Sequence, residues 1–332
     1  MNDYFLGIDI GGTAIKYGII DNDNNIIHKS TYPIDNQQTI TELLNQIIEL
    51  IDSCTELFPN LETIGIGMPC VVETDKNGEN ETITMAPNFP KWTKYNIGDQ
   101  IRKHYSDKKY TIAIENDANA AAIAEMTAGN AKEINNFVYI TLGTGIGGAI
   151  IINRKIFRGN NGGAGEIGHI IIDTDNHKYE IDENDKTKKP EWRKGTLEEA
   201  IGRKGIIELA NNFAKEYPLS IINKIDDIDV REIAKAANKQ DTAAILCLKQ
   251  VGEKLGYAIA TINHILDIQN FIIGGGISKA DIILQNATEI AQKRTLPSVA
   301  KVNIIQAKFN SKTGIIGTAL LGKIKKQQSN YQ

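Results

Sequence analysis

The chain has 332 residues, of which 41% are hydrophobic and 23% charged, and its formal net charge is −4 at pH 7. This length exceeds that of one usual hydrophobic core, so two lobes are expected. The small negative charge argues against nucleic-acid and membrane partners, and no apolar run is long enough to span a bilayer. Three widely spaced cysteines and the lack of a signal-peptide pattern predict a cytoplasmic protein with reduced thiols.

The first part of the chain reads as a hairpin followed by a helix. Apolar runs on either side of Gly11-Gly12-Thr13, at 4–10 and up to Ile20, predict two strands, and a third is expected near 26–32. Leucine and isoleucine at helical spacing predict an amphipathic helix over 38–57. Further on we expect a strand over 63–69, a loop or hairpin tip over 73–82, and a short helix near 97–105.

Residues 137–153 repeat the opening pattern. The segment Phe137–Gly145 aligns without a gap with Phe5–Thr13, and each ends at a glycine turn before a second apolar strand. Two hairpins can resemble each other by chance, but matched turns in register favour a duplicated architecture.

The second half of the chain alternates helices and strands, which predicts an α/β protein. A polar, irregular stretch over 173–195 is followed by expected helices at 196–216, 228–237 and 241–266, a strand over 270–273 and a helix after Ser278. A strand near 302–308 and a helix over 314–325 close the chain, with a frayed tail after Lys325. The apolar stripe of 241–266 fits a core, a lobe contact or a dimer contact equally well. We expect a small lobe of residues 1–115 plus about 310–332, and a large lobe of 116–309.

Three glycine turns follow apolar strands and are candidate nucleotide-binding elements. In the first, Gly11, Gly12 and Thr13 can present backbone and hydroxyl donors to phosphates, and Asp9 can hold a hydrated Mg²⁺. Lys16 can offset phosphate charge or simply lie at the surface. A plain glycine hairpin with a capping Asp is the alternative, and the spacing is not that of a Walker motif. In the other two turns, the candidates are Thr144 and Gly145 for phosphates, and Gly275 and Gly276 for a base or ribose.

The Asn116-Asp117 pair lies between the first two turns, where an apolar run meets an alanine-rich helical segment. Asp117 is either a helix cap or a general base, and its position between two candidate phosphate turns favours the second role. In Gly165-Glu166-Ile167-Gly168-His169, a carboxylate and an imidazole among glycines can hold vicinal hydroxyls. Glu-x-x-His is also half of a metal site, but no cysteine lies nearby to complete a zinc cage.

Five motifs spread over nearly the whole chain carry a family resemblance: Gly7–Thr13, Glu115–Asn119, Leu142–Gly148, Gly165–His169 and Ile273–Ser278. Together they resemble the motifs of the ROK family of bacterial sugar kinases, within the wider actin and sugar-kinase superfamily. The resemblance implies a two-lobed actin-like, ribonuclease H-like ATPase fold with duplicated mixed sheets flanked by helices. It also implies a homodimer.

The resemblance also implies a role for each candidate residue. Asp117 would take a proton from the sugar's 6-hydroxyl. The other sugar hydroxyls would be held by Asn88 (beside Trp92), Asn116, Glu166, His169 and Glu198. Asp9 would hold Mg²⁺ through water. ATP would be held by Gly11, Gly12, Thr13, Lys16, Thr144 and Gly145 at its phosphates and by Gly275 and Gly276 at its adenosine.

One departure from the family pattern concerns zinc. Family members commonly carry Cys-x-Cys-Gly-x-x-Gly-Cys after the glycine-rich His, whereas this chain has Lys189–Thr196 with only the last glycine kept. We therefore expect no zinc and a loop held by its own packing, with Trp192 as a candidate. The loop that positions Glu198 then differs from that of the family.

The expected function is ATP-dependent phosphorylation of a hexose 6-hydroxyl, with glucose first. N-acetylglucosamine and N-acetylmannosamine are the alternative sugars. A non-catalytic sugar-sensing ROK regulator is the alternative class, but such regulators carry a helix-turn-helix domain before the kinase-like part, and this chain starts at the first strand. Closure of two lobes on the sugar would exclude water, a competing acceptor.

Overall fold

The computed structural model describes residues 3–34, 38–74, 81–86, 92, 95–107, 110–174, 193–309 and 312–329. The chain forms two compact units: unit 1 is Met1–Ile134, Arg154–Ala164 and Lys308–Gln332, and unit 2 is Asn135–Asn153 and Gly165–Ala307. The boundary expected at residue 115 lies before that of the structure, because helix α3 (Asp117–Ala128) packs along the C-terminal helix α9 (Thr313–Ser329) of unit 1. In the described part of the chain, no helix is long and apolar enough to cross a membrane.

The sheet of unit 1 has the order β3-β2-β1-β4-β7. Strands β1 (Tyr4–Ile10) and β2 (Ala14–Ile20) form the predicted hairpin, and the expected third strand, β3 (Ile26–Pro33), pairs antiparallel with β2. Strands β4 (Leu61–Met68) and β7 (Thr111–Asn116) extend the sheet in parallel on the other side of β1. Parallel pairing brings the ends of β1, β4 and β7 to one edge. Asp9, near the end of β1, and Asn116, the last residue of β7, therefore share that edge.

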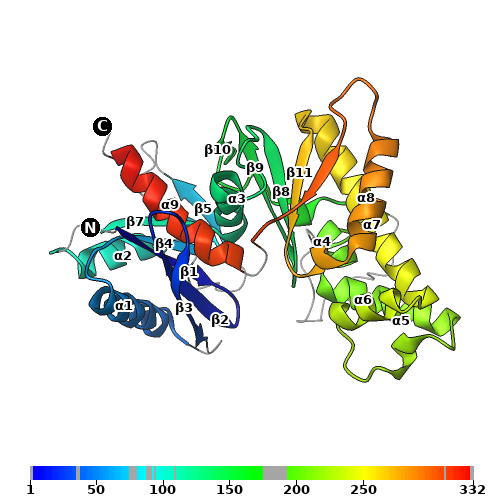
Figure 1. The fold of residues 1–332 in the computed structure, drawn as a ribbon, viewed down its shortest axis with the longest axis horizontal. Helices are drawn as coiled ribbons and strands as arrows, with labels where there is room; N and C mark the ends of the chain where they lie inside the picture. The colour runs from blue at the N-terminus through cyan, green and yellow to red at the C-terminus, as the bar shows by residue number, and fades with distance from the viewer. Residues whose placement is uncertain are drawn as a thin grey trace, which may run out of the picture. The chain divides into compact units, whose positions relative to one another are not determined.

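Helices α1 (Ile40–Leu57) and α9 cover the two faces of this sheet (Figure 1). The α1 face is a core of aliphatic residues that includes Leu6, Ile8 and Ile47. On the α9 face, Gly7 pairs in register with Gly18 and Gly65, and a Cβ on any of the three would meet α9 at less than 3 Å. These glycines let the backbone of α9 lie directly on the strands.

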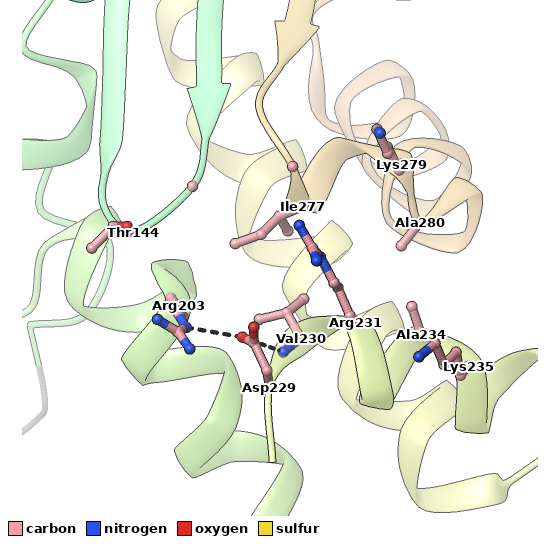
Figure 2. A pocket seen from close by; sticks show the side chains of 12 residues that line it. Thr144, Arg203, Asp229, Val230, Arg231, Ala234, Lys235, Ile277, Lys279 and Ala280 are labelled. Carbon is pink, nitrogen blue, oxygen red and sulfur yellow. Dashed lines mark hydrogen bonds and ion pairs between the residues drawn. The ribbon is translucent and has the colours of Figure 1, made fainter. Parts of the chain in front are cut away.

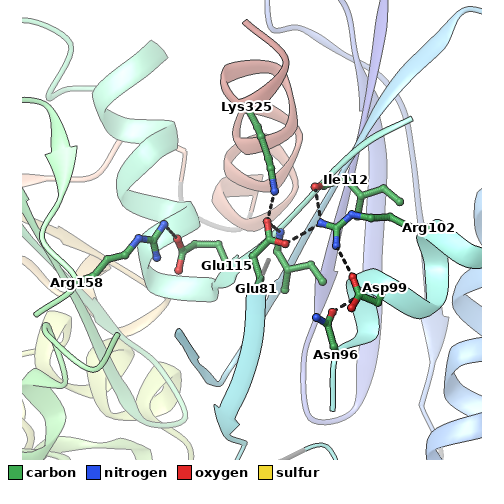
Figure 3. A network of polar contacts seen from close by, with 9 residues as sticks. Glu81, Asn96, Asp99, Arg102, Ile112, Glu115, Arg158 and Lys325 are labelled. Atoms are coloured by element: carbon green, nitrogen blue, oxygen red, sulfur yellow. Dashed lines mark hydrogen bonds and ion pairs between the residues drawn. The ribbon is translucent and has the colours of Figure 1, made fainter. Parts of the chain in front are cut away.

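The C-terminal end of α9 is held to the rest of unit 1 by ion pairs. Glu81 begins β6 (Glu81–Met85), which pairs with β5 (Val71–Thr74), and its side chain is only 4% exposed. It forms ion pairs with Arg102 of α2 (Ile97–His104) and with Lys325 of α9 (Figure 3). The helix continues to Ser329, so the fraying expected from Lys325 onward is wrong.

The sheet of unit 2 repeats this arrangement. Its strands β9 (Ile146–Ile152), β8 (Phe137–Leu142), β11 (Asn270–Gly274) and β12 (Asn303–Gln306) correspond in order and direction to β2, β1, β4 and β7. A short strand, β10 (Lys155–Ile156), follows β9. The duplication predicted from the matched glycine turns is confirmed, and so are the duplicated mixed sheets that the family resemblance implied.

Helices α5 (Arg203–Glu216), α6 (Val230–Asn238), α7 (Thr242–Leu266) and α8 (Asp281–Arg294) complete unit 2, together with the short α4 (Leu197–Ile201). The helix predicted over 196–216 is in fact two, because Gly202 adopts an extended conformation between α4 and α5. The apolar stripe of α7 lies in the core of unit 2, where Gly252 and Gly256 bring α7 close to α8.

Candidate functional site

Asp9 is the first candidate residue in unit 1. It faces Lys16 across the β1–β2 pair, immediately before the Gly11-Gly12-Thr13 turn, which Gly11 N closes by donating to Ala14 O at 2.9 Å. Burial, and then the charge of Asp117, raise the pKa of Asp9 to about 6, while Lys16 opposes this rise. Two carboxylates in unit 1 therefore lie within electrostatic reach of each other beside a glycine turn.

Asn116 and Asp117 occupy the junction of β7 and α3. Asn116 is the N-cap, and its Oδ1 accepts from Ala118 N at 2.8 Å and from Asn119 N at 3.1 Å. Asp117 is the first helical residue, and its Oδ1 also accepts from Ala118 N, at 2.8 Å. Capping of α3, predicted for Asp117, is thus shared, because Asn116 accepts two of the three bonds and Asp117 accepts one. The other carboxylate oxygen of Asp117 can therefore take part in a reaction.

The environment of Asp117 favours a proton acceptor. Burial raises its pKa above the ordinary value, although the backbone N–H groups of Ala118 and of Asp117 itself oppose the rise. A carboxylate that is poorly solvated gains more from taking up a proton than an exposed one. Asn116, expected to hold a sugar hydroxyl, already donates from Nδ2 to Cys70 O at 2.9 Å, which leaves it one N–H.

Glu115 precedes this pair and supports it, a role that the sequence did not reveal. Its side chain is 1% exposed and pairs with Arg158 at 2.5 Å (Figure 3). Its Oε1 accepts from Asn116 N and from Asn119 Nδ2, so it also supports the start of α3. Arg158 belongs to the segment that leads into the Gly165–His169 motif, and only the fold brings it to Glu115.

In unit 2, the second glycine turn is held by a helix that follows it far along the chain. Gly143 N donates to Gly145 O at 3.0 Å, and Ile146 N donates to Oε2 of Glu198 at 2.9 Å. Glu198 also forms an ion pair with Arg193. The structure thus puts Glu198, expected at the sugar, against the turn expected to bind phosphate.

Glu166 and His169 lie on a short 3₁₀ turn (Ile167–His169), with His169 Nε2 3.8 Å from Glu166 Oε2. Their side chains are 44% and 32% exposed, so both are accessible to a ligand. Burial lowers the pKa of His169, an effect that Glu198 opposes and Arg193 reinforces. A neutral imidazole can both donate to and accept from a hydroxyl.

A cavity of about 470 Å³ in unit 2 joins two of the predicted nucleotide turns (Figure 2). Thr144 and Gly276 both line it, whereas Gly145 and Gly275 are adjacent in sequence to lining residues. Its volume is within the range of small-molecule sites. Sequence reasoning missed its charged residues, Arg203, Asp229, Arg231, Lys235 and Lys279.

Four of these five charged residues are cations, so the cavity favours an anionic ligand. Asp229, the N-cap of α6, accepts from Arg203 Nε at 2.9 Å, which leaves the positive charge in excess. Nothing in the spacing of these residues along the chain indicated that α5, α6 and the turn before α8 meet here.

Two of the predictions concern residues outside the described ranges. Asn88 is one of them, and Trp192 is the other. The zinc site of the resembled family does not fit this chain, because lysine, glutamate and threonine stand at the positions of its three cysteines. The hydroxyl of that threonine, Thr196, caps α4 by accepting from Glu199 N.

The comparisons with known proteins agree with this architecture. A family model described as the ROK family matches residues 5–325. A glucokinase from Halalkalibacterium halodurans is 29% identical to this chain, over 98% of this chain and 96% of its own length.

Two solved structures extend this similarity to the fold. A ROK family glucokinase from Streptomyces griseus, in complex with glucose and AMPPNP, is 25% identical with a TM-score of 0.78, covering 97% of this chain and 99% of that chain. A ROK family transcriptional regulator, a homologue of the E. coli MLC protein, has a TM-score of 0.82 over 97% of this chain and 78% of its own, but at 21% identity it shows the fold alone. The family match over nearly the whole sequence shows that this chain belongs to the ROK family.

Proposed function

We propose that this protein is an ATP-dependent hexose kinase that transfers the γ-phosphate to the 6-hydroxyl of a sugar, with glucose as the preferred acceptor. The observation that carries the proposal is the pair of poorly solvated carboxylates in unit 1, Asp9 and Asp117, beside the first glycine turn. The similarity to glucokinases over nearly the whole chain supports both the reaction and the acceptor.

Asp117 is the general base in this proposal. Phosphoryl transfer relies mainly on positioning and charge stabilisation, and the acceptor hydroxyl must lose its proton as it attacks. The raised pKa of Asp117 makes its carboxylate a better acceptor for that proton. The other hydroxyls are held by Glu166, His169 and Glu198, and by Asn116 through its remaining N–H.

Asp9 is suited to hold Mg²⁺. The ion usually binds one or two protein carboxylates and keeps several waters, and a cation near Asp9 would relieve its repulsion with Asp117. When bound, Mg²⁺ neutralises charge on the donor phosphates. Gly11, Gly12 and Thr13 supply further donors to those phosphates, and the exposed Lys16 adds a positive charge.

The cavity of unit 2 takes the nucleotide in this proposal. Thr144 lies where phosphates would bind and Gly276 where the nucleoside would lie, and the excess of cations suits a polyanion. ATP is the proposed donor because the solved relative from Streptomyces griseus binds AMPPNP, an ATP analogue.

A coupled assay of ADP release over a panel of glucose, mannose, fructose, N-acetylglucosamine and N-acetylmannosamine tests the proposal. We expect the highest kcat/KM with glucose. In the same assay Asp117→Asn should lower kcat by about 10³-fold or more while glucose still binds, and substantial remaining turnover would contradict the assignment of the base. If no sugar releases ADP while one raises the melting temperature, the protein is a sugar sensor.

We also propose that the enzyme is a cytoplasmic homodimer. The three buried free cysteines fit a reducing compartment. Light scattering after gel filtration would measure the mass in solution, and a monomer at micromolar concentration would contradict the dimer.

A further inference from the structure

The side chain of Glu198 accepts a hydrogen bond from the backbone N–H of Ile146, the residue that follows the second glycine turn. It is the second residue of α4, and its carboxylate spans two groups, with Oε2 on Ile146 N and Oε1 on Arg193. A Cβ on Gly145 would collide with Oε2 of Glu198. Oε2 of Glu198 therefore lies directly against the backbone of the turn.

The corner between α4 and α5 fixes the same turn at a second point. Arg203 N, the first N–H of α5, donates to Thr144 O at 3.3 Å. Gly202, between the two helices, leaves no room for a Cβ beside Glu198 O. Thr144 and Ile146 are thus both held from this helical corner, so the shape of the turn depends on where α4 begins.

Arg193 in turn fixes the start of α4. Thr196 Oγ1 donates to Arg193 O at 2.9 Å, and Gly195 N donates to Glu199 Oε2 at 3.1 Å. Leu197 N donates to Ile170 O at 2.8 Å, which connects the segment to the residue that follows His169. These contacts hold residues 193–199 in place, and the threonine that stands at a cysteine position of the family serves as the helix cap.

The charge of Arg193 has a second consequence. A carboxylate held against a phosphate-binding turn would repel the phosphates, because both are anions in a partly desolvated place. Arg193 and Glu198 have side chains that are 35% and 22% exposed, so solvent screens this repulsion only in part. The guanidinium cancels the carboxylate's charge while holding it in position.

We propose that Arg193 and Glu198 form a metal-independent positioning pair that shapes the Thr144–Ile146 turn for the phosphates of the nucleotide. This rests on the proposed function only in assuming that the turn binds phosphate. It differs from a purely sugar-binding role for Glu198, and it assigns Arg193 a role in nucleotide affinity.

Calorimetric titration of ADP without Mg²⁺, and of glucose in a separate experiment, tests the pair. Arg193→Gln should weaken ADP binding by about 10-fold and glucose binding by less than 2-fold, because the uncompensated Glu198 charge lies beside the phosphates. In Arg193→Gln/Glu198→Gln, ADP affinity should recover at least half of the loss on a logarithmic scale, since glutamine removes the negative charge but can still accept from Ile146 N. Lys204→Gln, which removes an exposed cation from α5, is the matched control and should change ADP affinity by less than 2-fold.

Four results would overturn the proposal. They are unchanged ADP affinity in Arg193→Gln, an additive loss in the double variant, a larger effect on glucose than on ADP, and no ADP binding by the parent protein. Dialysis against a zinc chelator should leave ADP affinity unchanged, and a loss restored by zinc would refute the metal-independent part. Because ADP binding needs no turnover, an inactive parent that binds ADP would contradict the proposed kinase activity, while a loss in Arg193→Gln that the double variant restores would still support this pair.

Discussion

The Arg158 guanidinium pairs with the carboxylate of Glu115 (Figure 3), the residue that precedes Asn116-Asp117 in the chain. Glu115 is almost fully buried, whereas Arg158 is 30% exposed, so water can solvate the guanidinium only in part once the carboxylate is lost. Removing one member of a buried ion pair leaves an uncompensated charge, which typically costs about 3–5 kcal/mol.

Glu115→Gln should therefore lower the free energy of unfolding by about 2–4 kcal/mol, the partial exposure of Arg158 reducing the effect somewhat. Urea unfolding followed by circular dichroism measures it. The control is Glu62→Gln, which removes the ion pair with Lys326, where both side chains are about a third exposed. The control should lose less than about 1 kcal/mol of unfolding free energy. Equal losses in the two variants would refute a stabilising role for the ion pair between Arg158 and Glu115.

Asp9 should make stability depend on pH. Its pKa rises from 3.8 to about 6 on folding, so between these values the folded chain binds more protons than the unfolded chain. Stability therefore falls as pH rises from about 4 to about 6, and the penalty persists above that range.

Asp9→Asn removes this penalty. At pH 7 and without Mg²⁺, the variant should be more stable than the parent by about 3 kcal/mol, and the difference should vanish below pH 4. Urea unfolding from pH 4 to pH 8 measures the difference. In a background that carries Asp117→Asn, the stability difference that Asp9→Asn causes should appear at lower pH, since the charge of Asp117 contributes to the raised pKa of Asp9. A difference that does not vary with pH would contradict this account.

Local patterns predicted most of the elements but not how they meet. The strands flanking Gly11-Gly12-Thr13 and the amphipathic α1 follow from spacing within a few residues, and both form as expected. The break at Gly202 depends on the contact between Arg203 N and Thr144 O, far apart in the chain. The stripe of glycines under α9 likewise has a reason only once the last helix lies on the first strands.

The residues of the candidate site likewise fall into those that a local motif predicts and those that only long-range packing brings together. Asp9, Asp117 and Thr144 were identified because each lies in a short motif with its own chemistry. Arg158, Arg193 and Arg231 lie in no such motif, and their partners or cavities are set by long-range packing. Sequence spacing alone carries no signal for such contacts.

Gly314 controls the position of Asp9. A Cβ at Gly314, near the start of α9, would collide with Oδ2 of Asp9. The added Cβ would also meet Cγ of Asp9 but no backbone atom among its nearest contacts, so Gly314→Ala should turn the carboxylate aside with a smaller loss of stability than a collision with backbone would cause. We expect kcat to fall by about 10–100-fold, the effect of a displacement of about 1 Å at a catalytic group, and the apparent KM for Mg²⁺ to rise.

Gly317→Ala is the matched control on the same helix. Its Cβ would collide with the backbone of Ala120 in α3, which cannot move aside alone. This variant should lose stability, as shown by a lower melting temperature. If Gly314→Ala instead lowers the melting temperature as much as Gly317→Ala and leaves the KM for Mg²⁺ unchanged, Gly314 serves packing only.

The adjacent glycines of the third turn should separate fold from nucleotide binding. Gly275 has a φ of +86°, and a Cβ there would collide with the backbone of Leu142. Gly276 has an ordinary helical conformation, φ −69° and ψ −30°, and a Cβ there would meet no atom within 4 Å. Gly275→Ala should therefore destabilise the protein by about 1–3 kcal/mol, the usual size of such strain.

Gly276→Ala should leave the melting temperature unchanged, because its methyl group enters open space at the wall of the cavity. If the nucleoside lies against this wall, the methyl group raises the KM for ATP by about 5-fold or more, which corresponds to about 1 kcal/mol, and leaves the KM for glucose unchanged. Steady-state kinetics with each substrate varied in turn measures both constants. An unchanged KM for ATP in a stable Gly276→Ala enzyme would mean that the nucleoside does not contact Gly276. The added methyl group strains neither the backbone nor the packing there, so a contact with the bound nucleoside is the one effect that it can have on KM.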